Sequence, residues 1–168
     1  MKKVLILAVA AILLAACGAS SITPEEKAAR KQAKQQEVLS LIKNRHWVMN
    51  ARTMHSSLSG SKDIDFTYGV TIKGDTIISN LPYVGKTHNL VYGNDAGLNF
   101  VGAITEYRLD RPQKDANRVQ MVVAYDQNLY LYNFLIYDDG IIQLVVSSRN
   151  KEAIGFDGEI ARIKDNDK

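Results

Sequence analysis

The sequence predicts a mainly β domain of the α+β kind: a single antiparallel meander of about eight strands, barrel-like or half-barrel, with one N-terminal helix. From His46 onward, apolar residues recur at every second position, which is typical of strands with one buried face. Short turns that contain Gly or Asp separate these segments, as in hairpins. The segment 129–137 is apolar on both faces, so both faces need cover. A two-layer sandwich of sheet and helix is the alternative architecture.

Residues 1–16 resemble the signal peptide of a bacterial lipoprotein. Lys2 and Lys3 precede an apolar run that ends in Leu14-Ala15-Ala16-Cys17. This run is too short to span about 30 Å of hydrocarbon, and its basic flank and small final residues are typical of an export signal. The resemblance to a lipobox implies that Cys17 takes a diacylglycerol on Sγ and becomes the new amino terminus. We therefore expect an acyl chain anchor in the membrane of the bacterial cell envelope.

The residues after Cys17 are Gly18-Ala19-Ser20-Ser21, with neither aspartate nor an acidic run. By analogy with known sorting signals, we expect the outer membrane and a domain that faces the periplasm. Cys17 is the only cysteine, so no disulfide forms within one chain. Two of the 21 Lys and Arg leave with the signal, and the remaining 19 against 18 acidic side chains give a charge of +1. This balance does not indicate a nucleic-acid partner.

A flexible tether over 17–23 precedes a single domain over 24–168. Thr23-Pro24-Glu25-Glu26 has the pattern of a capping box with proline at the first helical position, and it predicts a helix over 24–43. Only the second half of this helix has closely spaced apolar residues. The first half carries four basic side chains that could contact anionic headgroups. A solvated spacer helix is the favoured reading, because nearby glutamates dilute the charge.

The β-rich part covers 46–163. Within the segment 65–72, Phe66, Tyr68, Val70 and Ile72 alternate with polar residues or glycine, which predicts one buried face. We expect the helix to lie on part of the outside of the curled sheet. The predicted strands are 46–53, 65–72, 76–81, 98–109, 118–125, 129–137, 141–148 and 153–163.

A search for catalytic or metal-binding constellations gives no candidate. The histidines His46, His55 and His88 are not at a metal-ligand spacing, and a lipidated Cys17 leaves no thiolate for zinc. None of the serines at 56, 57, 147 and 148 lies in a G-x-S-x-G elbow. We therefore expect no cofactor, no metal and no enzymatic activity, although a dispersed triad stays open.

The segment 82–97 is the longest stretch without clear periodicity. It contains Tyr83, His88 and Tyr92 among three glycines. Long loops with aromatic residues often bind ligands, and this one is the candidate binding loop. A structural loop whose tyrosines plug one end of the sheet is the equal alternative.

Several motifs together resemble the family called domain of unknown function 4251. They are Gly74-Asp75, Leu81-Pro82-Tyr83-Val84-Gly85, Tyr92-Gly93, Phe100-x-Gly102, Tyr107, Ser148-Arg149-Asn150-Lys151 and Ile154-x-Phe156-x-Gly158. Val84 and Lys151 depart from the family pattern, which has phenylalanine and arginine there. The resemblance implies a small lipoprotein with a charged N-terminal helix and a β-rich domain, and it assigns no activity. Asn150 and Lys151 are secondary candidate site residues, although Lys151 weakens bidentate anion recognition.

Three functional hypotheses follow. The first is a binding module of the envelope that takes a small apolar ligand or a protein partner through the loop 82–97. The second is a structural or assembly lipoprotein that pairs with a partner through a strand edge. The third is a hydrolase with a dispersed site, for which the spacing pairs no nucleophile with a base.

Overall fold

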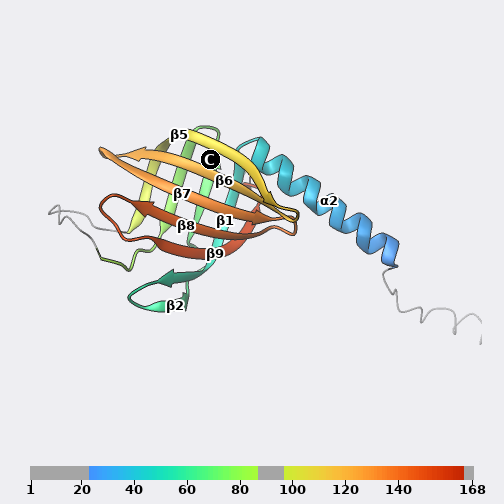
Figure 1. The fold of residues 1–168 in the computed structure, drawn as a ribbon, viewed down its shortest axis with the longest axis horizontal. Helices are drawn as coiled ribbons and strands as arrows, with labels where there is room; N and C mark the ends of the chain where they lie inside the picture. Colours follow the sequence, from blue (N-terminus) through green and yellow to red (C-terminus); the bar gives the residue numbers. More distant parts are fainter. Residues whose placement is uncertain (1–22, 87–96, 165–168) are drawn as a thin grey trace, which may run out of the picture. The chain divides into compact units, whose positions relative to one another are not determined.

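The chain closes an antiparallel barrel in the computed structural model, which describes residues 23–86 and 97–164 (Figure 1). Each strand pairs with the next along the order β1-β3-β4-β5-β6-β7-β8-β9, and β1 also pairs with β9. This last pairing closes eight strands into a ring, so the barrel prediction is confirmed over the sandwich. The strands are β1 (His46–Ser56), β2 (Gly60–Asp63), β3 (Gly69–Lys73), β4 (Thr76–Leu81), β5 (Leu98–Gln113), β6 (Ala116–Tyr125), β7 (Asn128–Tyr137), β8 (Ile141–Ser148) and β9 (Ile154–Ala161).

Large side chains fill the barrel interior. Trp47 packs edge-on against Phe134 with ring centroids 5.1 Å apart, and Tyr132 lies 6.1 Å from the same phenylalanine ring. Each fully buried side chain of this size contributes about 1.5–3 kcal/mol through the hydrophobic effect. The largest fully buried residues include Trp47, Tyr132, Phe134, Phe156, Met49 and Met121.

Helix α2 (Pro24–Lys43) has the predicted bounds. The hydroxyl of Thr23 accepts a hydrogen bond of 3.2 Å from the Glu26 amide, which satisfies one of the free donors of the first turn. The Glu26 carboxylate does not complete the reciprocal capping contact, because it pairs at 2.7 Å with Arg30. From Lys31 onward the chain belongs to one compact unit with the barrel.

The second half of α2 covers one end of the barrel, not the outside of the sheet as expected. Val38 and Ile42 are fully buried in the barrel core. The Ile42 carbonyl accepts a hydrogen bond of 2.8 Å from the Tyr107 hydroxyl. At the same end, the side chain of Lys34 lies against Gly140 in the turn after β7. The apolar stripe of the helix therefore closes the barrel where β1 begins.

Two local expectations are wrong around residue 65. Phe66 is 87 % exposed, and the strand starts only at Gly69. Asp65 explains the difference, since its carboxylate accepts from the Thr67 amide at 3.1 Å and its carbonyl accepts from the Tyr68 amide. These bonds form a turn that takes Phe66 out of the strand. Strand β2 was also not predicted, because all four of its residues are exposed and no alternation of apolar residues marks it.

Strand β7 is less covered than its apolar sequence suggests. Tyr130, Tyr132, Phe134 and Ile136 are buried, whereas the outward-facing Leu129 is 61 % exposed. The expectation that both faces of this strand are covered is therefore wrong along its outer side.

Candidate functional site

The candidate site lies at the barrel end opposite the second half of α2. Because neighbouring strands are antiparallel, β4, β6 and β8 all end there, and so does β1. The described start of the predicted binding loop, residues 82–86, meets the connection between β8 and β9 at residues 149–153. The sequence predicted a site residue in each segment.

Tyr83 joins these two segments. Its hydroxyl lies 2.9 Å from the carbonyl oxygen of Lys86 and 3.3 Å from that of Glu152. The backbone adds a reciprocal pair, in which the Glu152 amide donates to the Lys86 carbonyl at 3.2 Å and the Lys86 amide donates to a Glu152 carboxylate oxygen at 3.3 Å. We call these contacts the Tyr83 latch. The latch holds two chain segments that are far apart in sequence in one fixed arrangement.

Glycine is required twice beside the latch. A Cβ on Gly85 would lie 2.6 Å from the Tyr83 hydroxyl, so the ring covers the space that a side chain would need. Gly97 has a φ of +68°, and a Cβ there would lie 2.9 Å from the Leu81 carbonyl oxygen. A side chain at Gly97 would therefore be strained as well as crowded.

Lys151 lies over the ring of Tyr83, with Nζ 4.6 Å from the ring centroid. A cation in this position is attracted to the negative face of the ring, and at a partly exposed site the attraction amounts to about 0.5–1 kcal/mol. The Lys151 amide also donates to the Ser148 hydroxyl at 3.2 Å. The structure thus brings together two of the residues singled out from the sequence.

Asn150 makes a different contact at the same end. Its side-chain amide donates to the Asn128 side-chain oxygen at 3.0 Å, which ties the β8–β9 connection to the start of β7. Phe100 lies next to the turn between β6 and β7. Its ring is stacked on Tyr125 with ring centroids 4.5 Å apart and is tilted against Tyr130 at 4.9 Å. These aromatic rings support the turn between β6 and β7.

The remaining predicted site residues, Cys17, His88 and Tyr92, lie outside the described residues. The sequence missed Lys86 and Glu152, whose contacts complete the latch. No local signal identifies them, because each is an ordinary charged residue until its distant partner is known.

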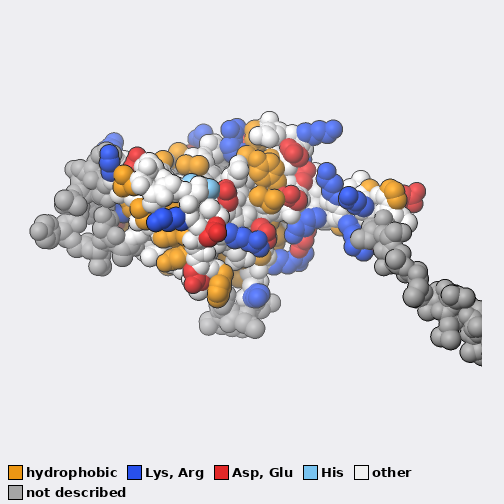
Figure 2. All heavy atoms as spheres, turned by 90° about the horizontal axis from the view of Figure 1, so that it is seen from below, with side chains coloured by type: hydrophobic (Ala, Val, Ile, Leu, Met, Phe, Trp, Pro, Cys, Tyr) orange, Lys and Arg blue, Asp and Glu red, His pale blue; other side chains and the backbone are white. Residues whose placement is uncertain are grey.

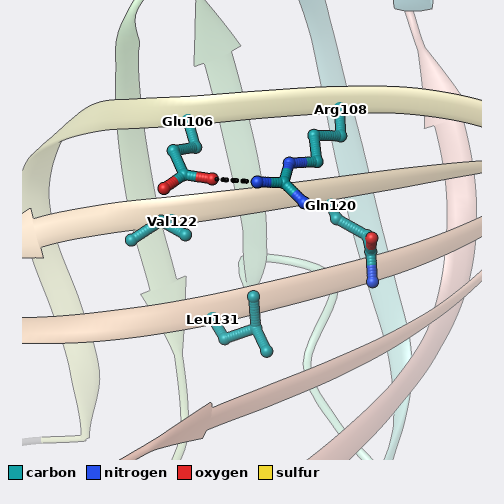
Figure 3. A pocket seen from close by; sticks show the side chains of 5 residues that line it. All are labelled: Glu106, Arg108, Gln120, Val122 and Leu131. Carbon is teal, nitrogen blue, oxygen red and sulfur yellow. Dashed lines mark hydrogen bonds and ion pairs between the residues drawn. The ribbon is translucent and has the colours of Figure 1, made fainter.

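A second feature is a shallow hollow of about 210 Å³ on the outer wall of β5, β6 and β7 (Figure 3). Glu106 and Arg108 point toward one another across its upper rim and form an ion pair at 2.9 Å. Both side chains are more than half exposed, and pairs of this kind contribute little. Gln120, Val122 and Leu131 complete the lining, and the Gln120 side-chain amide donates to Asn133 at 2.8 Å, so the polar groups of the hollow already have partners within the protein.

Charges of both signs are mixed on the face seen in Figure 2, with small apolar areas between them. Within residues 23–86 and 97–164, no three His, Cys, Asp or Glu side chains are grouped as metal ligands. No helix in the same ranges is long and apolar enough to cross a membrane.

A comparison with protein families shows to which family this chain belongs. The profile of the family described as "Domain of unknown function (DUF4251)" matches residues 29–160. The chain belongs to the DUF4251 family. The resemblance found in the sequence motifs is therefore confirmed, and the matched range includes the latch and the barrel as far as Ile160, one residue before β9 ends.

A solved structure supports the DUF4251 fold. The chain is similar to the crystal structure of a DUF4251 family protein from Bacteroides eggerthii DSM 20697, with a TM-score of 0.63 and 10 % identity. The match covers 80 % of this chain and 91 % of that chain. At this identity the likeness concerns the fold alone. No functionally curated protein matches the sequence.

Proposed function

We propose that this DUF4251 protein is a lipid-anchored binding module of the bacterial cell envelope that docks a protein partner at the latched end of its barrel. The anchor is Cys17, and the docking surface is formed by residues 82–86 and 149–153. The observation that carries the proposal is the Tyr83 latch, because it fixes two surface segments before any partner arrives. A surface that is ordered in advance loses less conformational entropy on binding.

The filled barrel interior favours a protein partner over a small apolar ligand. A carrier needs an enclosed cavity of a few hundred Å³. Here the interior positions are taken by Trp47, Tyr132 and Phe134, which are fully buried, and both Trp47 and Tyr132 lie against the Phe134 ring. The described interior therefore supports a role in which recognition takes place at the surface.

Barrel closure argues against assembly through a long strand edge. Among the described strands, β2 is paired on one side alone. It has four residues, and two of them are the charged Lys62 and Asp63. A short, charged edge is typical of strands that avoid pairing with other chains.

Site-specific photocrosslinking in intact cells of the native host tests the docking surface. A photoreactive residue at Val84, which is 39 % exposed, should give one dominant protein adduct. The matched control is Asp75, which is 77 % exposed in a turn at the opposite barrel end and should give none. Equal adducts from both positions would contradict the proposal.

A second variant separates docking from mere proximity. Glu152→Ala removes the carboxylate that accepts from the Lys86 amide, so residues 82–86 lose part of their fixed arrangement. We expect the Val84 adduct to fall at least about fivefold while the melting temperature changes little, because the latch is at the surface. An unchanged adduct would show that the latch does not prepare the surface.

A further inference from the structure

Three side chains on neighbouring strands form a hydrogen-bonded chain that the sequence did not reveal. Ser61 Oγ lies 2.8 Å from His55 Nδ1, and His55 Nε2 lies 2.8 Å from Asp157 Oδ2. Ser61 belongs to β2, His55 to β1 and Asp157 to β9. The side chain of His55 is 39 % exposed and that of Asp157 is 46 % exposed, so solvent can reach both.

A β-bulge places His55 on the outside of the barrel. Trp47, Met49 and Ala51 point into the core, and continued alternation would send residue 55 inward as well. The pairing of β1 with β9 shifts register between Ala51 and Thr53, after which Met54 and Ser56 are buried. His55 therefore faces outward on the same side as Asp157. Bulges often redirect side chains in this way beside functional sites.

The β1–β2 register explains the close approach of serine to histidine. The Ile64 amide donates to the Arg52 carbonyl at 2.9 Å, so these two residues form a hydrogen-bonded pair. Hydrogen-bonded and non-hydrogen-bonded pairs alternate along an antiparallel ladder. His55 and Ser61, which lie directly opposite each other, therefore form a non-hydrogen-bonded pair. Side chains of such pairs lie closest together in an antiparallel ladder. The same alternation points the Ser61 backbone N–H away from β1, toward the free edge of β2.

The carboxylate determines the direction of the hydrogen bonds. An ionised Asp157 can only accept, so neutral His55 carries its proton on Nε2 and donates it to the carboxylate. Nδ1 is then an acceptor, and the Ser61 hydroxyl donates to it. A serine whose proton is held by an oriented imidazole is an activated nucleophile.

We propose that Ser61, His55 and Asp157 form a serine-nucleophile site for carboxylic esters. Ser61 Oγ bonds to the ester carbonyl carbon as its proton moves to His55 Nδ1, and the Ser61 N–H at the strand edge donates to the developing oxyanion. The bond to the alcohol oxygen breaks, and the alcohol leaves with the proton from Nδ1. Water then attacks the acylated serine, returns a proton through Nδ1 to Ser61 Oγ, and releases the carboxylic acid. Asp157 is a positioning residue, because it acts through the imidazole.

The exposed position of the three residues indicates the substrate class. The three residues lie on an exposed wall of three strands, and none of them lines the hollow found on the barrel wall. An ester with an accessible acyl group fits such a surface. Its alcohol also leaves more readily than an amine would. This activity is independent of the docking proposal.

Covalent labelling tests the site directly. The full-length lipidated protein is treated with a fluorophosphonate, whose phosphorus takes the serine oxygen as fluoride leaves, and the modified residue is located by peptide mass spectrometry. We expect modification at Ser61 and its complete loss in Ser61→Ala. The matched control is Ser57→Ala, which changes an exposed serine in the adjoining turn and should leave labelling unchanged. Modification spread over several surface serines would overturn the proposal.

Two further variants separate catalysis from structure. His55→Gln removes the base. In Asp157→Asn, the asparagine amide donates a hydrogen bond to Nε2 in place of the carboxylate that accepted one. The imidazole proton then lies on Nδ1, which can no longer accept from Ser61. Both should slow labelling, and hydrolysis of p-nitrophenyl acetate, by about a hundredfold. Their melting temperatures should stay close to that of the parent, since all three groups are at the surface. Labelling that survives in both variants would show that the contacts only hold β2 to the barrel.

Discussion

Tyr132 and Ser79 are joined by a hydrogen bond of 3.0 Å that crosses the barrel interior from β7 to β4. Both residues are buried, and the two strands are not neighbours in the sheet. A buried hydroxyl that loses its partner retains the full penalty for leaving water. This contact therefore fixes the spacing of opposite barrel walls and is sensitive to the removal of one member.

Tyr132→Phe should lower the free energy of unfolding by about 1–3 kcal/mol, because Ser79 then stays buried with its partner removed. Urea denaturation of the full-length protein measures the change. The double variant Tyr132→Phe with Ser79→Ala should lose less than the sum of the two single variants. Strictly additive losses would mean that the hydroxyls do not depend on one another.

Gly85→Ala should open the Tyr83 latch, because the new methyl group would lie only 2.6 Å from the Tyr83 hydroxyl oxygen and would push the ring away. The hydroxyl would then leave the carbonyls of Lys86 and Glu152, and both connections would open more often. Limited trypsin digestion should cut after Lys86 and Lys151 several times faster, at an unchanged melting temperature. Val84→Ala is the control, since it shortens an exposed side chain beside the latch. Equal cleavage of both variants would contradict this role for Gly85.

Alkaline pH should destabilise the barrel through its buried tyrosines. Burial raises the pKa of Tyr107 to about 12, with opposing effects from Trp47 and Arg45, and burial also raises the pKa of Tyr132. The unfolded chain then releases protons from about pH 10 while the folded chain retains them, so stability falls as pH rises from there to about 12. Tyr107→Phe should flatten this fall by at most about 3 kcal/mol. Guanidinium unfolding at a series of pH values measures the free energy of unfolding of the parent and of the variant. An equally steep fall with pH in the variant would exclude Tyr107 as a cause of the alkaline destabilisation.

Ile42→Ala should lower the free energy of unfolding by about 2–5 kcal/mol, since it leaves a cavity where α2 closes the barrel. Ile42 is fully buried, whereas the neighbouring Leu39 is only partly buried. Leu39→Ala is therefore the matched control and should cost clearly less. Chemical denaturation compares the free energies of unfolding of the two variants. Similar decreases in both would mean that Ile42 is less tightly packed against the barrel than the structure shows.

Cys17→Ser should move the protein from the membrane fraction to the soluble fraction of the native host, because no acyl chain can then attach. Fractionation and mass spectrometry of the mature amino terminus give the measurement. Thr23→Ser, a change in the helix cap, should leave the distribution unaltered. A Cys17→Ser variant that stays membrane-bound would show that another feature anchors the chain.

Local chemistry in the sequence determined the bounds of α2 and most of the strands. Thr23 and Pro24 start the helix through capping and a fixed backbone angle, and these effects involve adjacent residues alone. Periodicity and the short turns that contain Gly or Asp likewise predicted β4, β6, β7 and β8 closely, because both signals depend on residues near one another in the sequence. The set of short motifs from Gly74-Asp75 to Ile154-x-Phe156-x-Gly158 predicted the family, and the profile match over residues 29–160 confirms it.

Only the tertiary structure decided barrel closure and the two proposed sites. Closure depends on the pairing of β1 with β9, and the latch joins Tyr83 to Glu152 across 69 positions. His55 and Asp157 are 102 positions apart, and a bulge at Arg52 decides that the histidine faces outward at all. Local periodicity carries no information on which distant strands become neighbours or where a register shifts. These features arise from the packing of the whole barrel core.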